Sequence, residues 1–221
     1  MRVAPDSPFV TFADMQQSDS TVEDNSDSGL VAYFGYGSLV NRATHRTRIL
    51  DAIPASLVGW RRFWRPRPDM PGFPAALLTV REEEGAVCDG LLVVDRAEHL
   101  AAVDAREARY RRVAVSLERL RSSRAVPREC PVYVFVADEH VPIHPERPLI
   151  LRSYLDAVLQ GFLDVHGEDG VRRFIAETDG FDTGLHDDRA DPIYPRSVAL
   201  RAGEADLFAR HLAHLTRNPV S

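Results

Sequence analysis

Residues 30–40 read LVAYFGYGSLV, an apolar and aromatic run that leads into Gly37 and Ser38. The run predicts a buried strand over residues 30–36 that ends at Gly37. A glycine at that point allows the backbone to approach a ligand closely, and a turn there can point successive N–H groups into a pocket. Such donors suit a carboxylate or an oxyanion. The same local pattern also fits a turn that binds no ligand.

Five more segments have the alternation or the apolar runs of strands, at residues 56–64, 74–80, 89–94, 110–117 and 131–137. The stretch EEEG at residues 82–85 has the composition of a turn between two of them. Helical spacing of apolar residues is found mainly later, at residues 96–107, 149–165, 170–178 and 204–215. Gly167 is a stop signal for the longest of these helices. Strands first and helices afterwards predict an α+β fold rather than alternating βαβ units.

The composition excludes several kinds of chemistry. The 221 residues include 27 basic side chains, all of them arginine, and the net charge is -6. Without lysine the chain has neither a Schiff-base nucleophile nor a P-loop, and the acidic balance argues against nucleic acid as a partner. Cys88 and Cys130 are too few for a disulfide framework, so we expect two buried thiols.

The N-terminal residues 1–28 differ from the rest because they are polar and acidic. They bury too little apolar surface to offset their ordering entropy, so we expect a disordered tail. We expect one domain over residues 29–221, including the C-terminal helices. No apolar run approaches the ~20 residues that a membrane span needs, and no secretory signal is visible. We therefore expect a cytoplasmic protein.

A second segment, DAREARYRRV at residues 104–113, places Glu107 between a predicted helix and a predicted strand. A carboxylate at such a junction can reach into a cavity. The alternative is a solvated glutamate paired with a neighbouring arginine.

Together, FGYGSL after the first strand and D-x-R-E-x-x-Y about 70 residues later resemble the gamma-glutamylcyclotransferase-like superfamily. The resemblance extends over residues 30–180 and implies a mixed, barrel-like six-stranded sheet with flanking helices and a ligand cavity. YGSL and the Arg–Glu pair are more similar to the ChaC-type branch, which acts on glutathione, than to the branch acting on simple gamma-glutamyl amino acids. The resemblance implies that Glu107 is the general acid/base and that the substrate is bound by Tyr36, Gly37, Ser38, Leu39 and Tyr110.

The activity that this resemblance implies converts glutathione, a gamma-glutamyl peptide or a gamma-glutamyl amine into 5-oxoproline and a free amine. The substrate's own α-amine attacks its γ-carbonyl, so the reaction needs neither a protein nucleophile nor a metal or other cofactor. One carboxylate near both nitrogens can take a proton from the first and give one to the second. The partner is then a small molecule, and we expect no nucleic acid, no membrane, and a monomer or homodimer.

Other segments allow alternative functions. Residues 61–67, RRFWRPR, suit binding of a polyanion such as single-stranded nucleic acid. The alternative is that the aromatic side chains pack the core or line the pocket, while one of the arginines binds a substrate carboxylate. Residues 191–195, DPIYP, indicate a rigid turn over the cavity. A module that binds a carboxylate without turnover is the main functional alternative. Two histidine pairs have spacings that a metal ion could use: His140 with His144, and His211 with His214. Histidines with such spacings more often lie on solvated faces of the protein.

Overall fold

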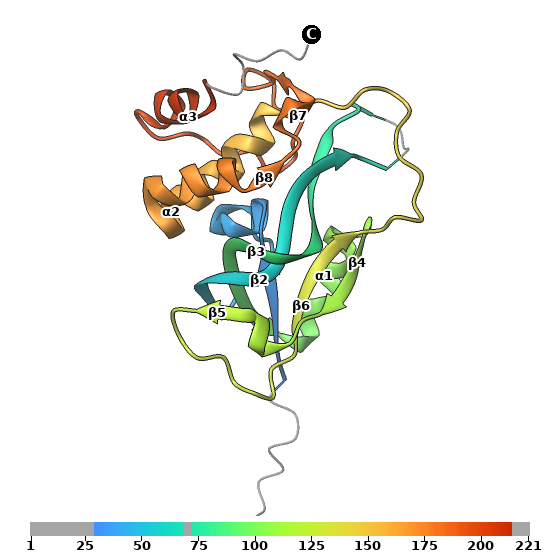
Figure 1. Ribbon diagram of the computed structural model, residues 1–221, viewed down its shortest axis with the longest axis vertical. Helices are drawn as coiled ribbons and strands as arrows, with labels where there is room; N and C mark the ends of the chain where they lie inside the picture. Colours follow the sequence, from blue (N-terminus) through green and yellow to red (C-terminus); the bar gives the residue numbers. More distant parts are fainter. Residues whose placement is uncertain (1–28, 69–71, 214–221) are drawn as a thin grey trace, which may run out of the picture.

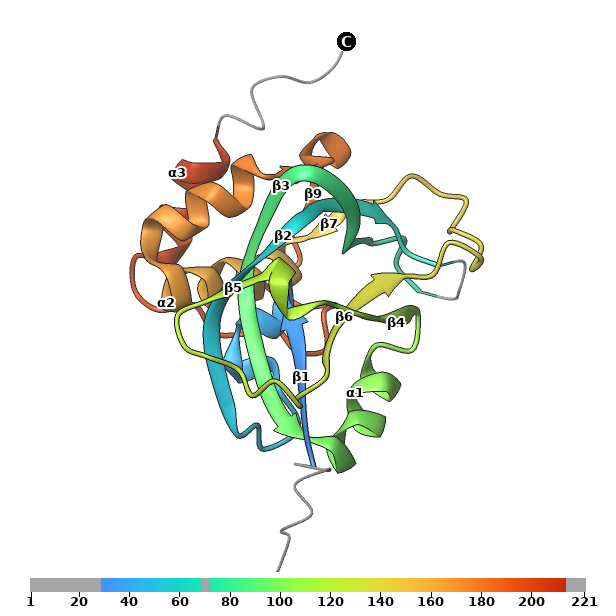
Figure 2. The same cartoon turned by 60° about the horizontal axis from the view of Figure 1, so that its bottom comes forward.

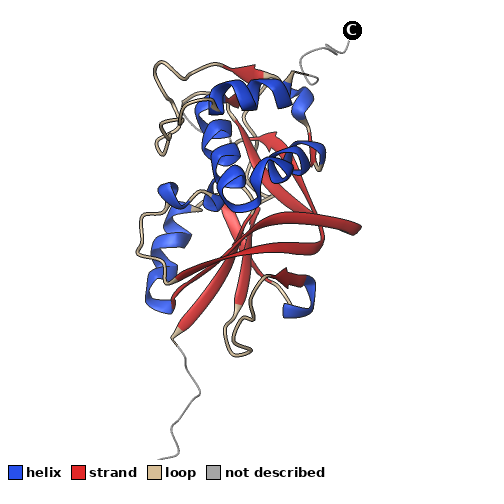
Figure 3. Cartoon of the chain, turned by 90° about the vertical axis from the view of Figure 1, so that its left-hand side faces the viewer, coloured by secondary structure: helices blue, strands red, loops and turns tan. Residues whose placement is uncertain are grey.

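The computed structural model describes residues 29–68 and 72–213. The predicted tail at residues 1–28 therefore lies outside the described residues, as does the end of the last predicted helix. In Figure 1 a curved sheet occupies the middle of the molecule, with most of the helical structure on one side. Figure 3 shows the same separation of helices from strands, and the predicted α+β class is confirmed.

The main sheet is mixed and has seven strands: β1 (Leu30–Gly35), β2 (Asp51–Pro66), β3 (Ala76–Arg96), β4 (Tyr110–Ala114), β5 (Leu120–Ser122), β6 (Val132–Ala137) and β8 (Thr178–Asp179). Six of them follow one path in the order β4-β6-β1-β3-β2-β5, and β8 pairs with β2 beside this path. The strand β1 runs antiparallel to β3 and parallel to β6. Within the described residues β4 and β5 form the two ends of the path, so the sheet is curved but open.

The long hairpin of β2 and β3 unites two of the six predicted strands in one, and the short unpredicted strands β5 and β8 bring the main sheet to seven. Both strands of the hairpin are long, at 16 and 21 residues, and Figure 2 shows them as curved neighbours. The strands predicted at residues 74–80 and 89–94 are both part of β3, so the turn predicted at residues 82–85 is wrong. Val58 pairs with Val87 but Trp60 pairs with Glu82, so the acidic stretch is an irregularity inside one strand. Pairing with β2 resumes on both sides of it and keeps the strand continuous.

The helices agree with the sequence predictions. The helix α1 (Leu100–Arg106) lies within the predicted segment 96–107. The long helix α2 (Arg152–Ala176) breaks at Gly167, where φ is 67° and ψ is -170°, and so covers both predicted segments. The helix α3 (Glu204–Leu212) packs against α2, and two short strands, β7 (Ile150–Leu151) and β9 (Leu185–His186), pair in parallel. Among the described helices, none is both long and apolar enough to cross a bilayer.

The core lies between the sheet and α2. Leu155, Phe162 and Phe174 of α2 belong to the same buried cluster as Leu78 and Leu91 of β3. The two free cysteines are buried in this cluster as well, as predicted. Burial of apolar surface against the long hairpin is therefore what attaches α2 to the sheet.

Residues 61–67 are largely part of this packing. The Arg62 side chain is 1% exposed, and its guanidinium carbon lies 4.9 and 4.5 Å from the ring centroids of Phe162 and Phe174. Arg67 is buried as well. Because two arginines of the stretch lie inside the molecule, it does not present the continuous basic surface that the polyanion alternative requires.

The loop that follows β1 is attached to α2 through Asn41, which is 4% exposed. Its Nδ2 donates to the carbonyl of Ala157 at 2.9 Å and to Oε1 of Gln160 at 3.1 Å, and its Oδ1 accepts from the Ala43 N–H at 3.0 Å. Gly161 allows this approach, since a Cβ there would lie 2.6 Å from the Asn41 backbone nitrogen. The loop and the helix therefore fit together only with a glycine at this position.

We predict that Gly161→Ala lowers the free energy of unfolding by about 1–3 kcal/mol, because the added methyl group forces the loop and α2 apart. Denaturant unfolding followed by circular dichroism measures the change. Arg172→Ala, at an exposed position of the same helix, is the control and should change stability by less than about 0.5 kcal/mol. Equal stability of the wild type and Gly161→Ala would contradict the close packing.

Candidate active site

The loop after β1 begins with a close approach to α2 at Gly37. A Cβ on Gly37 would lie 3.0 Å from the Tyr154 hydroxyl and 3.4 Å from Cδ1 of Leu78. A 3-10 turn over Ser38–Val40 follows, so the N–H groups of Ser38 and Leu39 have no acceptor within the turn. Both residues line a narrow cavity that also contains Glu107. The loop therefore places backbone donors beside a carboxylate.

Glu107 stands where α1 ends and the chain turns into β4. Its N–H donates to the Val103 carbonyl at 2.9 Å, and its own carbonyl accepts from the Tyr110 N–H at 2.8 Å. The predicted helix-to-strand junction is confirmed. The alternative of a solvated glutamate is right about the pairing with a neighbouring arginine, Arg106, but wrong about solvation, since the Glu107 side chain is only 15% exposed.

Arg106 connects Glu107 to the loop after β1. Its Nε donates to Oε1 of Glu107 at 2.9 Å, its Nη1 donates to the Thr44 carbonyl at 2.9 Å, and its Nη2 donates to Oγ of Ser38 at 3.3 Å. The Arg106 side chain is 8% exposed. Solvent screens such a pair weakly, and the guanidinium therefore holds the carboxylate in a defined position relative to the loop.

Three tyrosines surround the carboxylate. The Tyr36 hydroxyl donates to the Phe135 carbonyl at 2.5 Å, and the Tyr110 hydroxyl donates to the Leu78 carbonyl at 2.8 Å. Among the described residues the Tyr154 hydroxyl has no hydrogen-bond partner, so it is available to a ligand. Burial raises the pKa of all three phenols well above the ordinary value, and they are neutral near pH 7.

Burial also raises the pKa of Glu107 above its ordinary value. The positive charges of Arg106 and Arg196 and the hydrogen bond from Arg106 act in the opposite direction. A carboxyl group with a raised pKa accepts a proton more readily near neutral pH than an exposed glutamate does. The environment of Glu107 is therefore suited to proton transfer in both directions.

The structure brings all six predicted site residues into one narrow cavity: Tyr36, Gly37, Ser38, Leu39, Glu107 and Tyr110. A wider cavity of about 370 Å³ adjoins it, and Ser38, Glu107, Tyr110 and Tyr154 line both. That volume suits a small molecule.

The histidine pairs do not form a metal site in the described part of the chain. The His140 ring contacts the Asp138 carboxylate at 3.2 Å, and the His211 ring contacts the Glu168 carboxylate at 2.8 Å. His214 lies outside the described residues. Within residues 29–68 and 72–213, no three metal-ligating side chains come together.

Comparison with protein families places this site in context. A family model described as "Gamma-glutamyl cyclotransferase, AIG2-like" matches residues 33–150. The chain belongs to this family. The matched region contains both the loop after β1 and Glu107. No curated protein matches the sequence.

Among the solved structures similar to this gamma-glutamyl cyclotransferase family member, one has the same fold. One described as "Gamma-glutamyl cyclotransferase" is 12% identical, covers 82% of this chain and 99% of its own, and has a TM-score of 0.52. An uncharacterized human protein is 14% identical, with coverages of 81% and 98% and a TM-score of 0.46. A yeast gamma-glutamyl cyclotransferase specific to glutathione is 14% identical, with coverages of 84% and 96% and a TM-score of 0.43. The predicted resemblance to this superfamily is confirmed.

The gamma-glutamyl cyclotransferase match ends at residue 150, but later residues also line the wider cavity. The turn predicted at residues 191–195 covers it with Ile193, Tyr194 and Pro195. Other polar residues of the wider cavity were not assigned individually from the sequence, among them Arg67, Arg106, Tyr154 and Arg196. Arg67 belongs to the stretch in which one unspecified arginine was expected to bind a substrate carboxylate, and Arg106 belongs to the motif around Glu107. No sequence pattern pointed to Arg196, because a single arginine in a loop resembles any surface residue.

We predict that Glu107→Gln raises the free energy of unfolding at pH 7. The pKa of Glu107 is higher in the folded than in the unfolded state. At pH values above the folded-state pKa, ionisation of Glu107 therefore lowers the free energy of unfolding. The penalty disappears below the unfolded pKa of about 4.3, where both states are protonated. Denaturant unfolding at pH 7 and pH 3.5 should therefore show a larger gain at pH 7.

The control for this measurement is Glu84→Gln, which changes an exposed carboxylate on β3 in the same way and should leave stability nearly unchanged. A loss of stability in Glu107→Gln at pH 7 would mean that the ion pair with Arg106 outweighs the burial of the carboxylate.

Proposed function

We propose that the protein converts a gamma-glutamyl compound into 5-oxoproline and a free amine, with Glu107 as the general acid/base. The observation that carries this proposal is the buried Glu107 carboxylate in a cavity shared with the glycine loop after β1. Membership of the gamma-glutamyl cyclotransferase family supports it. The closer relation to the ChaC-type branch stays a prediction.

The first step is attack of the substrate's α-amine on its own γ-carbonyl. The amine arrives as an ammonium, and the Glu107 carboxylate takes one proton from it. The nitrogen then forms a bond to the γ-carbon and closes a five-membered ring. A cavity that holds the substrate folded back on itself accelerates this step, since effective molarities for well-oriented groups reach ~10⁵–10⁸ M.

The tetrahedral intermediate carries negative charge on the former carbonyl oxygen. The N–H groups at the start of the 3-10 turn, those of Ser38 and Leu39, are the donors available to this oxygen. The neutral hydroxyl of Tyr154, close to Gly37, is a third donor at the same place. Arg106 fixes the position of Glu107 relative to the loop by donating hydrogen bonds to both.

The second step breaks the bond between the γ-carbon and the leaving nitrogen. Protonated Glu107 returns its proton to that nitrogen, so the amine leaves neutral and the carboxylate is regenerated. The leaving amine thus receives the first proton of the ammonium. The ring nitrogen still carries one hydrogen too many, so the regenerated carboxylate takes this second proton and passes it to the released amine, which becomes an ammonium ion, or to solvent, and a neutral lactam remains. The reaction uses no nucleophile other than the α-amine of the substrate.

We predict that Glu107→Gln reduces the rate of 5-oxoproline release by about 10²–10⁴-fold, because the amide neither accepts nor donates the proton. Chromatographic detection of 5-oxoproline from glutathione, gamma-glutamyl dipeptides and gamma-glutamyl amines measures the rate. Glu84→Gln, the exposed counterpart, should keep the activity.

Two outcomes would contradict the mechanism or the function. Full activity in a folded Glu107→Gln protein would remove Glu107 from the reaction. Thermal stabilisation of the wild type by these compounds with no product formed would instead support a module that binds a carboxylate without turnover.

We predict that kcat/KM falls as the pH drops through the raised pKa of Glu107, so the acidic limb lies above the ordinary glutamate value of about 4.3. Arg196→Gln should move this limb to higher pH, because the positive charge of Arg196 lowers that pKa. Rate profiles between pH 4 and 9 test both statements. An acidic limb at or below 4.3 would show that burial of Glu107 does not govern the reaction.

A further inference from the structure

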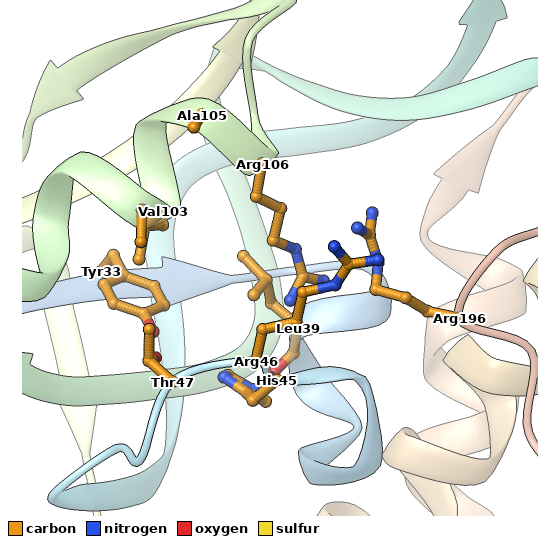
Figure 4. Close-up of a pocket in the computed structure, with 10 residues that line it drawn as sticks. Tyr33, Leu39, His45, Arg46, Thr47, Val103, Ala105, Arg106 and Arg196 are labelled. Atoms are coloured by element: carbon orange, nitrogen blue, oxygen red, sulfur yellow. Dashed lines mark hydrogen bonds between the residues drawn. The ribbon is translucent and has the colours of Figure 1, made fainter.

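A second cavity of about 330 Å³ lies next to the wider active-site cavity. Arg106 and Arg196 line both cavities and therefore form part of their common wall. The second cavity does not include Glu107, and its other walls come from β1, the end of α1 and the segment that follows the loop after β1. Figure 4 shows Tyr33, Leu39 and Thr47 on these walls.

Three arginines meet at this cavity from three distant parts of the chain. Arg46 comes from the segment before β2, Arg106 from the end of α1, and Arg196 from the segment before α3. Figure 4 shows their side chains pointing toward one another. Three positive charges in one place repel each other, and an anion between them relieves that repulsion.

The arginines of this cluster differ in their partners. Arg106 is already bonded to Glu107. Among the described residues neither Arg46 nor Arg196 forms an ion pair with a carboxylate, and Nε of Arg196 donates to the Tyr194 hydroxyl at 3.2 Å. Elsewhere arginines such as Arg61 and Arg189 pair with aspartates. Arg46 and Arg196 therefore keep N–H donors for a ligand.

Arg196 is also held in place from outside the cavity. The Asp188 carboxylate accepts from the Ser153 N–H at 2.8 Å, from the Ser153 hydroxyl at 2.5 Å and from the Ile193 N–H at 2.9 Å. The Tyr194 N–H donates to the same hydroxyl at 3.3 Å. These bonds attach the segment before Arg196 to the start of α2, so the backbone next to Arg196 is already ordered before a ligand binds.

The remaining polar groups of the cavity do not cancel this charge. His45 adds none at neutral pH, because burial lowers its pKa while its Nε2 contacts the Leu39 carbonyl at 2.8 Å. Thr47 and Tyr33 contribute neutral hydroxyls. The cavity therefore suits a carboxylate, for which the guanidinium group is the preferred partner because two parallel N–H groups match its two oxygens.

We propose that Arg46 and Arg196 bind a carboxylate on the leaving part of the substrate and thereby select gamma-glutamyl compounds whose leaving amine is anionic. This rests on the proposed function. The reacting γ-carbonyl enters the narrow cavity beside Glu107, which at about 40 Å³ does not hold a whole glutamyl group, so the rest of the substrate lies in the wider cavity. The leaving part extends to Arg196 on the common wall and past it to Arg46 in the second cavity. Arg46 and Arg196 are specificity-determining residues, whereas Glu107 does the chemistry.

The test compares substrates that differ only in one charge. Gamma-glutamylalanine and its alaninamide counterpart have the same leaving nitrogen, and glutathione and its glycinamide place the same change one residue farther away. We expect the wild type to prefer the carboxylate form of at least one pair by about 10-fold in kcat/KM, since hydrogen bonds between charged groups have this strength. Arg46→Gln and Arg196→Gln should each reduce that preference several-fold, and the double variant should nearly abolish it.

The control is Arg48→Gln, which removes a charge from an exposed position two residues after Arg46 and outside both cavities. It should keep the wild-type preference. The double variant Arg46→Glu and Arg196→Glu should instead favour a gamma-glutamyl derivative of 1,2-diaminoethane, whose leaving part is cationic. Thermal melting curves establish that each variant is folded.

The outcomes separate this inference from the proposed function. Equal kcat/KM for both members of each pair in the wild type, or an unchanged preference in the double glutamine variant, would overturn the role of the two arginines while leaving the cyclisation intact. Absence of 5-oxoproline from every substrate would overturn the proposed function and, with it, the assignment of the arginines.

Discussion

The guanidinium of Arg106 is the contact on which the site depends. It binds the Glu107 carboxylate and also the Thr44 carbonyl and the Ser38 hydroxyl, which lie more than 60 positions earlier in the chain. A buried carboxylate without a partner would be costly. With this partner it stays ionisable, and burial still raises its pKa. One side chain thus decides both the position and the protonation behaviour of Glu107.

The scaffold keeps this contact in place from two sides. The β2–β3 hairpin provides the surface on which β1 and α2 pack, and Asn41 attaches the loop after β1 to α2. The loop after β1 packs so closely against Gly161 that there is no space for a Cβ, and this contact restricts the conformations open to the loop. The loop that carries part of the site is therefore anchored to β1 and α2, and the C-terminal segment adds side chains to the site from outside.

Sequence patterns predicted most elements, and the resemblance carried by FGYGSL and D-x-R-E-x-x-Y implied six of the residues that line the narrow cavity. That was possible because the strand, the glycine turn and the helix-to-strand junction at Glu107 are local features with local causes. The continuity of β3 could not be predicted, since EEEG at residues 82–85 has the composition of a turn and the strand is kept continuous only by pairing with β2 on both sides of this stretch. The position of Arg196 at the cavity could not be predicted either, because no motif near it in the sequence indicates a cavity.

The sequence by itself determined the α+β class, the loop at residues 36–39 and the candidate carboxylate, because side-chain periodicity and short motifs are properties of neighbours along the chain. Tertiary structure decided that Glu107 is buried, that Arg106 joins it to the loop, and that Arg46 and Arg196 meet at a second cavity. Burial and charge clustering depend on residues that are far apart in sequence. Only folding brings them within the few ångströms over which desolvation and hydrogen bonding act.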